Sequence, residues 1–199
     1  MEQFVWGTLL LNGEGFDPNL PQPQLYEKPI QSWLDIGSGN GEACTTNYIN
    51  KLVWHGYDGQ VKIACDPNAW EAGKDWRIVR ELYGEKCSLW NQHFDLITAW
   101  DILEHLEKKE GEKWLDHFEE VANRLIVIFT PQGFLPQGNE QGFHDLDVHK
   151  SGWEVEDFIK RGYATYLTPK DFHHNPTGVI GDFAAILAWK NFAVRPKGT

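Results

Sequence analysis

The sequence is short of positive charge. Its 199 residues include 18 Lys and Arg against 29 Asp and Glu, which gives a formal net charge of −11 at pH 7. Proteins that bind the phosphate backbone, or that dock on anionic membranes, use clustered Lys and Arg for that purpose. The charge therefore argues against both kinds of partner, and we expect no nucleic acid among the partners of this chain.

The sequence also lacks a long hydrophobic run and contains little cysteine. A helix that spans a bilayer needs about 20 consecutive apolar residues, and the sequence has no such run, so we expect no membrane span. Met1–Phe4 shows no basic region leading into an apolar core, so we expect no signal peptide. The cysteines are odd in number and lack C-x-x-C spacing, which favours reduced core thiols and a cytoplasmic location. They are Cys44, Cys65 and Cys87.

Aromatic residues, by contrast, are abundant. The 10 Trp residues either fill the core or form a platform for a flat substrate, since an indole face is large and rigid. Hydrophobic residues make up 41% of the chain, which suits one domain over residues 1–199. Residues 1–30, rich in Pro, Gly, Asn and Gln, predict an irregular N-terminal arm. The sequence leaves open whether this domain is a module of a larger protein.

Strand-like and helix-like segments alternate along the chain, which indicates an α/β fold with a mainly parallel sheet. We expect the last two strands to pair antiparallel. Strands are predicted at 32–36, 61–65, 94–100, 125–130, 163–167 and 183–189, and helices at 42–52 and 111–124.

Two segments need separate comment. Residues 77–82 fit either a strand or a helix, because their periodicity decides neither. Ser151 and Glu154 have the spacing of a capping box, which predicts a helix from Ser151 to about residue 161 with Gly162 as its stop.

The most specific pattern follows the first predicted strand. The run Trp33–Ile36 leads into Gly37-Ser38-Gly39-Asn40-Gly41 and then a helix-like stretch. Glycines let backbone N–H groups approach a ligand closely, and the helix N-terminus adds partial positive charge. The dinucleotide fingerprint G-x-G-x-x-G would require glycine at position 42, where this chain has Glu42. The pattern resembles motif I of the class I S-adenosylmethionine (SAM)-dependent methyltransferases.

This resemblance implies a Rossmann-like, doubly wound α/β fold and a SAM site. It implies that the backbone of Gly37, Ser38 and Gly39 approaches the cofactor, and that Asp35 lies near its methionine end. Asp66, followed by Pro67 after the second predicted strand, would accept both ribose hydroxyls, since a carboxylate offers two acceptor oxygens. From the residues alone, Asp66 could equally cap a helix or form an Asx turn.

The stretch Phe94–Leu106 resembles the fourth motif of the same family. The resemblance implies that Trp100 and Asp101 lie beside the sulfonium end of the cofactor. The spacing D-x-x-E-H places Asp101, Glu104 and His105 on one side of a helical turn. Either His105 or Asp101 acts as a general base, or the three side chains hold a divalent metal with a later histidine, as in a similar E-x-x-E-H pattern of some methyltransferases. Because the first acid is Asp rather than Glu, the metal interpretation is not favoured, and a purely structural turn is the third alternative.

A fifth-motif resemblance covers Leu125–Gln137, and residues 142–162 add a weaker likeness to methyltransferases of glycan and surface-polysaccharide pathways. Loop 132–150 is long for a connection, and long loops are usually functional, so we expect it to hold the acceptor. Polar side chains of this loop are candidates for binding acceptor hydroxyls, and the adjacent pair His173-His174 is treated as loop residues. The loop candidates are His144, Asp145, Asp147 and His149.

These patterns together predict a SAM-dependent O-methyltransferase that acts on a hydroxyl of a sugar or glycan and releases S-adenosylhomocysteine (SAH). Alignment of the nucleophile, carbon and sulfur is the main task of such a protein, and a base removes the alcohol proton. Three alternatives stay open: another small-molecule acceptor such as a quinone precursor or a carboxylate, an NAD(P)-dependent oxidoreductase, and a non-catalytic SAM-binding partner subunit.

Overall fold

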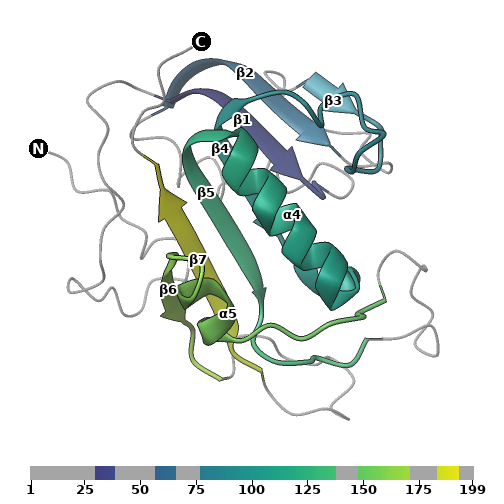
Figure 1. The fold of residues 1–199 in the computed structure, drawn as a ribbon, viewed down its shortest axis with the longest axis vertical. Coiled ribbons are helices and arrows are strands. Elements are labelled where there is room, and N and C mark those ends of the chain that lie inside the picture. The colour runs from purple at the N-terminus through teal and green to yellow at the C-terminus, as the bar shows by residue number, and fades with distance from the viewer. Residues whose placement is uncertain (1–29, 39–56, 66–76, 138–147, 171–182, 193–199) are drawn as a thin grey trace, which may run out of the picture. The chain divides into compact units, whose positions relative to one another are not determined.

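The computed structural model describes residues 30–38, 57–65, 77–137, 148–170 and 183–192 (Figure 1). Within these residues one 7-stranded sheet is formed, in the order β3-β2-β1-β4-β5-β7-β6. The strands are β1 (Ile30–Ile36), β2 (Tyr57–Cys65), β3 (Arg77–Val79), β4 (Phe94–Trp100), β5 (Ala122–Pro131), β6 (Ala164–Leu167) and β7 (Ala185–Asn191). The described helical segments are η1 (Leu103–His105), α4 (Lys108–Val121) and α5 (Val155–Ile159).

The pairing of the strands confirms the predicted sheet. β1 pairs with β2 in parallel, with Leu34 opposite Ile63, and β2 pairs with β3 in parallel. β6 and β7 are antiparallel, with Thr165 opposite Ala188, as expected for the last two strands. Of the ambiguous residues 77–82, 77–79 form the short strand β3. The predicted helix at 42–52 lies outside the described residues.

Contacts divide the chain into two compact units. The first consists of Met1–Thr98, Val121–Leu125 and Asn191–Thr199, and the second of Ala99–Glu120 and Ile126–Lys190. The expectation of one domain over 1–199 stays a prediction, and most of the predicted arm, 1–29, lies outside the described residues. No helix in the described ranges is long and apolar enough to cross a membrane.

The first unit is centred on buried strands, and two of its cysteines lie in the described residues. Trp33, Leu34 and Ile36 of β1 are at most 1% exposed, and Ile63 of β2 is 2% exposed. Cys65 and Cys87 are free, buried thiols with their Sγ atoms 3.9 Å apart. The expectation of reduced core thiols is confirmed for these two residues, whereas Cys44 lies outside the described part of the chain.

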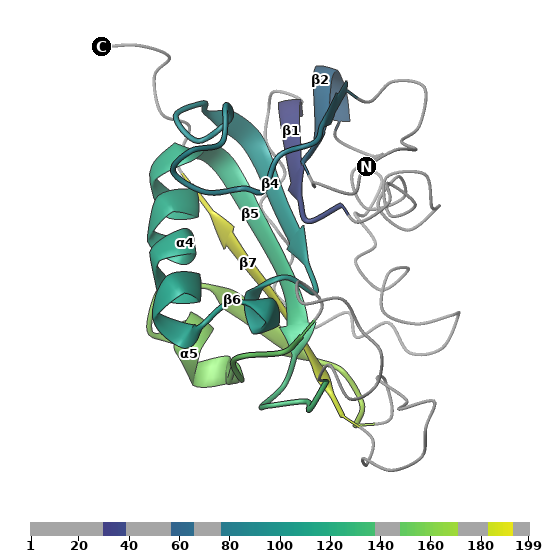
Figure 2. The same ribbon diagram turned by 90° about the vertical axis from the view of Figure 1, so that its right-hand side faces the viewer.

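In the second unit, α4 lies along β5, as Figures 1 and 2 both show. Its buried face carries Trp114 and Phe118, whose rings pack edge-on with centroids 6.0 Å apart. The predicted helix at 111–124 is shifted, because it begins at Lys108 and ends at Val121. Ala122 starts β5 directly, so the last predicted helical residues belong to that strand.

The predicted capping box at Ser151 is wrong. The hydroxyl of Ser151 donates to the Leu103 carbonyl at 3.1 Å and accepts a hydrogen bond from the indole N–H of Trp153, so it is not available as a cap. The helix begins at Val155 instead, and Asp157 Oδ2 accepts the backbone N–H of Glu154, the true N-cap. The helix was predicted to run to about residue 161 with Gly162 as its stop, but it ends at Ile159. Gly162, with φ of 81°, lies in the turn that follows.

Candidate active site

The glycine turn after β1 adopts the backbone that its sequence requires. Gly37 has φ of 69°, in the left-handed region that favours glycine, and its N–H donates to the Cys65 carbonyl at 2.9 Å. Ser38 follows it and is 3% exposed. The Ser38 hydroxyl is buried and has no hydrogen-bond partner in the described part of the chain. A buried polar atom of this kind fits a ligand that would supply the missing partner.

Asp35 is fixed inside the first unit by a hydrogen-bonded chain of side chains. The indole Nε1–H of Trp33 donates to Thr98 Oγ1 at 2.8 Å, and the Thr98 hydroxyl donates to Asp35 Oδ1 at 2.5 Å. Asp35 is only 1% exposed, so its carboxylate is held in one position. The one sign of this hydrogen-bonded chain in the sequence is the Thr within the otherwise apolar end of the strand Phe94–Trp100.

The second unit contains the residues of the D-x-x-E-H pattern. Asp101 follows β4 with φ of 48°, and its N–H donates to the Phe129 carbonyl at 2.8 Å. Its backbone is left-handed and η1 contains only Leu103–His105, so the expectation that Asp101 shares one helical turn with Glu104 and His105 is wrong. Trp100, just before it, packs on Phe129 and keeps a buried indole N–H without a hydrogen-bond partner in the described residues.

Glu104 is a buried acid, 2% exposed. Its Oε2 accepts a hydrogen bond from the Thr130 hydroxyl at 2.9 Å, and its Oε1 is buried and receives no hydrogen bond from an N–H or hydroxyl group of the described residues. Thr130 was missed by the sequence analysis, although it ends an apolar run just before Pro131.

Asp101 and Glu104 are neighbouring acids that influence each other's pKa. Burial, followed by the negative charge of Asp101, raises the pKa of Glu104 well above the usual carboxyl range. Loss of hydration also raises the pKa of Asp101, although its side chain keeps access to solvent and a hydrogen bond with Glu104 lowers the value in part. Because burial and the neighbouring charge both oppose ionisation of Glu104, the pair without a bound cation keeps a proton at a pH where an isolated carboxyl has lost it.

Two histidines stand next to this pair. The rings of His105 and His149 lie 4.7 Å apart, edge to face. His149 Nδ1 contacts the Leu135 carbonyl at 2.7 Å, and His105 Nδ1 contacts the Val148 carbonyl at 3.4 Å. A carbonyl oxygen only accepts, so the Nδ1 of each ring carries the proton in these contacts.

The arrangement brings together three possible metal ligands. One ligand atom each from Glu104, His105 and His149 can be chosen so that all lie within 4.8 Å of one another. Imidazole nitrogens with an added carboxylate suit divalent transition metals, and hydrogen bonds from Nδ1 to backbone carbonyls are typical of metal-binding histidines. The sequence analysis had placed His149 among the acceptor-binding residues, whereas the structure places it beside His105.

The remaining predicted site residues lie outside the described ranges, so their roles stay predictions. They are Gly39, Asn40, Gly41, Asp66, Pro67, His144, Asp145, Asp147, His173 and His174.

Solved structures with similar folds include several methyltransferases. The small RNA methyltransferase HEN1 is 17% identical to this chain, with a TM-score of 0.50. The match covers 83% of this chain but only 23% of the HEN1 chain. The magnesium protoporphyrin IX methyltransferase ChlM from Synechocystis PCC 6803, crystallised with SAH, gives 0.48 at 14% identity over 83% of this chain and 75% of that one. The plantazolicin methyltransferase BpumL, also with SAH, gives 0.48 at 13% identity, over 82% and 77% of the two chains.

No family model and no curated protein sequence matches this chain. At these identities the structural likeness shows the fold alone. It confirms the expected Rossmann-like α/β fold with a mainly parallel sheet.

Proposed function

We propose that this chain is a SAM-dependent O-methyltransferase. The observation that carries the proposal is the turn after β1, where Gly37 is left-handed and the buried Ser38 hydroxyl has no partner in the described residues. Leaving such a group unsatisfied costs about 1–3 kcal/mol, which a bound cofactor would offset. The fold supports the same conclusion, because open α/β sheets bind ligands at the carboxyl ends of their strands.

The cofactor set predicted from the sequence is retained as part of this proposal. SAM supplies a methyl group that its sulfonium already activates, and SAH is the product. The chain has to bind the cofactor, exclude water and hold the acceptor in line. The proposed cofactor residues are Asp35, Gly37, Ser38, Gly39, Asp66, Pro67, Trp100 and Asp101.

The acceptor hydroxyl must lose its proton as it attacks. His105 directs its Nδ1–H to the Val148 carbonyl, so in the neutral form of the ring Nε2 is the proton-accepting atom. It can therefore take a proton at that atom near neutral pH. Asp101 is the second candidate base, and its raised pKa brings it closer to the operating range of such a group.

The same side chains fit a divalent cation. Glu104 Oε1 receives no hydrogen bond from an N–H or hydroxyl group of the described residues, and His105 and His149 lie beside it with their tautomers set by backbone carbonyls. We therefore propose that these three residues hold a divalent metal, with Asp101 next to them, in contrast to the preference drawn from the sequence. A bound cation would supply a Lewis acid that lowers the pKa of the acceptor hydroxyl.

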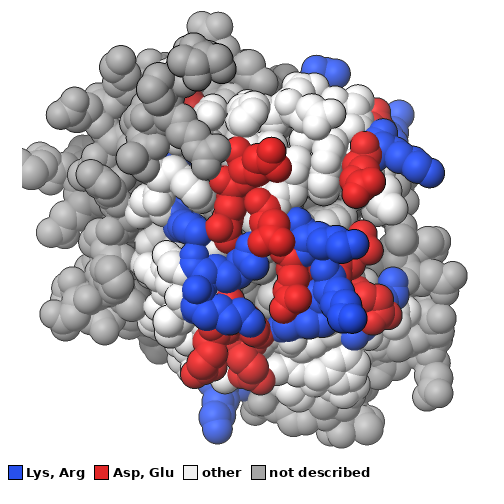
Figure 3. Space-filling model, in the orientation of Figure 1, with Lys and Arg blue, Asp and Glu red and all other residues white. Residues whose placement is uncertain are grey.

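For the acceptor we propose a hydroxyl of a sugar or glycan. The support is the likeness of part of this chain to glycan methyltransferases. The described residues of that part, 131–137 and 148–158, include His149 and also Leu135, whose carbonyl contacts the His149 ring. HEN1 is by name a small RNA methyltransferase. Here Lys and Arg intermix with Asp and Glu over α4 and α5 (Figure 3), in pairs such as Arg161–Asp116 and Lys190–Glu119, which does not favour a polyanion.

Calorimetry with SAM and SAH tests the cofactor site. Saturable binding of both is expected, with none for NAD. Asp66→Ala should weaken SAM binding by at least about tenfold, because two charge-assisted bonds of about 1.5–3 kcal/mol each are lost. Glu85→Ala, at an exposed position, is the matched control. The absence of saturable SAM binding would refute the proposal, and unchanged affinity of Asp66→Ala would remove that residue from the site.

Activity on a panel of sugars, glycans, other small molecules and RNA then identifies the acceptor. EDTA should abolish turnover and Mn²⁺ or Co²⁺ should restore it, and His149→Ala should prevent the restoration. His93→Ala, at an exposed position away from the cluster, is the control. Full turnover in EDTA would leave His105 as a simple base, and SAM binding without any turnover would indicate a non-catalytic subunit.

A further inference from the structure

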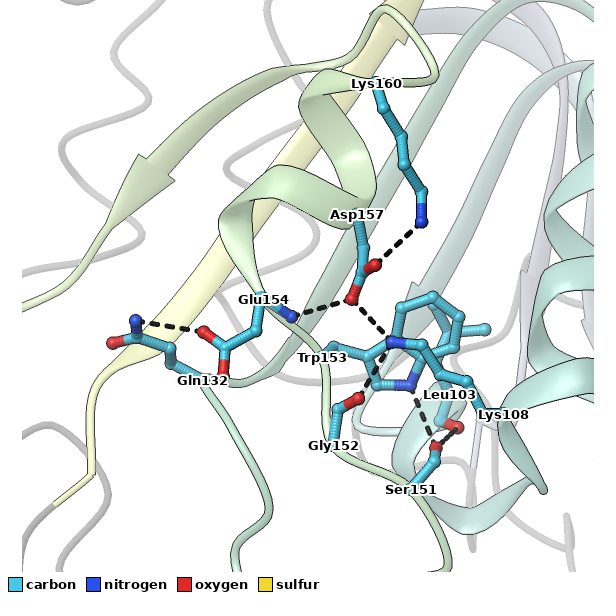
Figure 4. Close-up of polar contacts among 9 residues, drawn as sticks. All are labelled: Leu103, Lys108, Gln132, Ser151, Gly152, Trp153, Glu154, Asp157 and Lys160. Atoms are coloured by element: carbon cyan, nitrogen blue, oxygen red, sulfur yellow. Dashed lines mark hydrogen bonds and ion pairs between the residues drawn. The ribbon is translucent and has the colours of Figure 1, made fainter.

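Lys108, the first residue of α4, is held in three ways by one segment of the chain (Figure 4). Its Nζ donates to the Gly152 carbonyl at 2.8 Å and to Asp157 Oδ2 at 2.5 Å. The same Nζ lies 3.6 Å from the centroid of a Trp153 ring, in the geometry of a cation–π contact. The three partners are 44 to 49 residues away in the sequence, so Lys108 joins distant parts of the chain.

Lys108 contacts Gly152, Trp153 and Asp157, which belong to the same segment of the chain as His149. The backbone N–H groups of Lys150 and Ser151 both donate to the Glu104 carbonyl, at 2.7 and 3.1 Å. The Ser151 hydroxyl donates to the Leu103 carbonyl at 3.1 Å. Residues 149–153 therefore lie against η1, which contains Glu104 and His105, and this contact is what brings His149 to them.

Trp153 connects the two sets of contacts. It is 1% exposed, and its indole N–H donates to the Ser151 hydroxyl at 3.1 Å. Its carbonyl accepts the Gly133 N–H at 2.7 Å, which ties the segment to the chain just before Leu135. Leu135 in turn supplies the carbonyl that fixes the His149 ring.

The anion that pairs with Lys108 is itself well fixed. Partial burial acts to raise the pKa of Asp157, but hydrogen bonds from Lys108, Lys160 and the Glu154 backbone outweigh it and lower the pKa to about 2. Asp157 is therefore ionised at neutral pH. An isolated surface ion pair contributes little to stability, so the value of this one lies in the geometry that it imposes on the segment.

We propose that Lys108 is a positioning residue for the Glu104–His105–His149 cluster. Its ammonium group holds Gly152, Trp153 and Asp157 to the start of α4, and so keeps residues 149–153 on η1 with the His149 ring beside His105. This inference rests on the proposed function only for the task of the histidine, because the contacts that position the ring are independent of any cofactor.

The test compares three variants of the full chain. Lys108→Met keeps the aliphatic stem and removes the charge, Lys108→Arg restores the charge, and Lys109→Met removes a neighbouring exposed charge as the control. The measurements are NMR of the His149 tautomer, hydrogen exchange of the Lys150 and Ser151 amides, and Co²⁺ binding followed by its visible absorption.

For Lys108→Met we expect loss of the fixed Nδ1–H tautomer of His149 and faster exchange of both amides by about tenfold or more, as for a local opening. Co²⁺ affinity should fall by a similar factor, while SAM affinity and the global unfolding midpoint stay close to those of Lys109→Met. Lys108→Arg should recover most of each signal. A fixed tautomer and unchanged exchange in Lys108→Met would overturn the proposal.

The two proposals fail in different ways. If the wild-type chain binds no Co²⁺, the metal site is wrong, but the tautomer and the amide exchange still decide the role of Lys108. If Lys108→Met does not fold, Asp157→Asn removes the anionic partner without a change in size and should release the same amides. In that case, unchanged exchange of the Lys150 and Ser151 amides in Asp157→Asn would overturn the proposal.

Discussion

Gly111→Ala offers a sharp test of how Trp153 packs on α4. A Cβ built at Gly111 would lie 2.5 Å from Trp153 Cζ2 and 3.2 Å from its Cη2. The indole of Trp153 has little room to move away from Gly111. It is 1% exposed, its Nε1–H donates to the Ser151 hydroxyl, and Lys108 lies over its ring. The absence of a side chain at position 111 is therefore what allows the indole to lie on the helix.

Two opposing effects set the magnitude. In a helix interior, Ala is favoured over Gly by about 0.8–1.0 kcal/mol, so propensity alone predicts a more stable protein. Forcing extra atoms into a packed core costs about 1–3 kcal/mol. The distance from the added Cβ at position 111 to Trp153 lies far below ordinary van der Waals separation. We therefore expect the packing cost to exceed the gain in helix propensity. We expect a net loss of about 1 kcal/mol in the free energy of unfolding.

Urea denaturation of the wild type and Gly111→Ala measures this difference. A double-mutant cycle with Trp153→Phe provides the control, because the smaller ring leaves room for the methyl group. In the Trp153→Phe background, Gly111→Ala should become neutral or stabilising. A gain of about 1 kcal/mol from Gly111→Ala alone, the value of propensity, would refute the packing of Trp153 against α4.

Thr98→Val should destabilise the chain by about 1.5–3 kcal/mol in urea, since it removes the hydroxyl that donates to the buried Asp35 carboxylate. Thr98→Ser should recover most of the lost stability. Equal free energies of unfolding for the wild type and the two variants would contradict the hydrogen bond from Thr98 to Asp35. Stability should also fall as pH rises from about 4, because the raised pKa values of Asp101 and Glu104 keep a proton in the folded state that the unfolded chain has already released. Glu104→Gln should flatten this pH profile and raise stability at pH 7, and a profile unchanged by the substitution would show that the pair is not its origin.

The strands were predictable from the sequence because their signal is local. The run Phe94–Trp100 is a strand over the residues predicted, and its first six residues are buried. The helix predicted at 111–124 is also present, with Trp114 and Phe118 buried, although its ends are displaced to Lys108 and Val121. Those ends depend on where β5 begins, which is a property of the sheet rather than of the helix.

The cluster was less predictable because its contacts are long-range. His149 was expected to bind the acceptor since it follows a long polar loop, and nothing near it in the sequence indicates a ring contact with His105. Likewise, the hydroxyl of Ser151 has the spacing of a cap, but it bonds to Leu103, which lies 48 residues away. Local patterns cannot weigh such alternatives, because each depends on the packed positions of two distant segments.

The acids Asp101 and Glu104 are the residues whose arrangement the stability of the fold explains least. Glu104 is 2% exposed, and the Asp101 backbone lies in the left-handed region, which costs a non-glycine residue about 1–2 kcal/mol. Loss of hydration raises the pKa of both carboxyls, and the charge of Asp101 raises that of Glu104 further, so the fold would gain stability from neutral residues at these positions. Unfavourable arrangements of this kind persist when the function needs them. A bound cation or a proton in transfer would supply the compensating charge, and for this reason we propose that the reaction takes place at the Asp101–Glu104 pair rather than at the histidines alone.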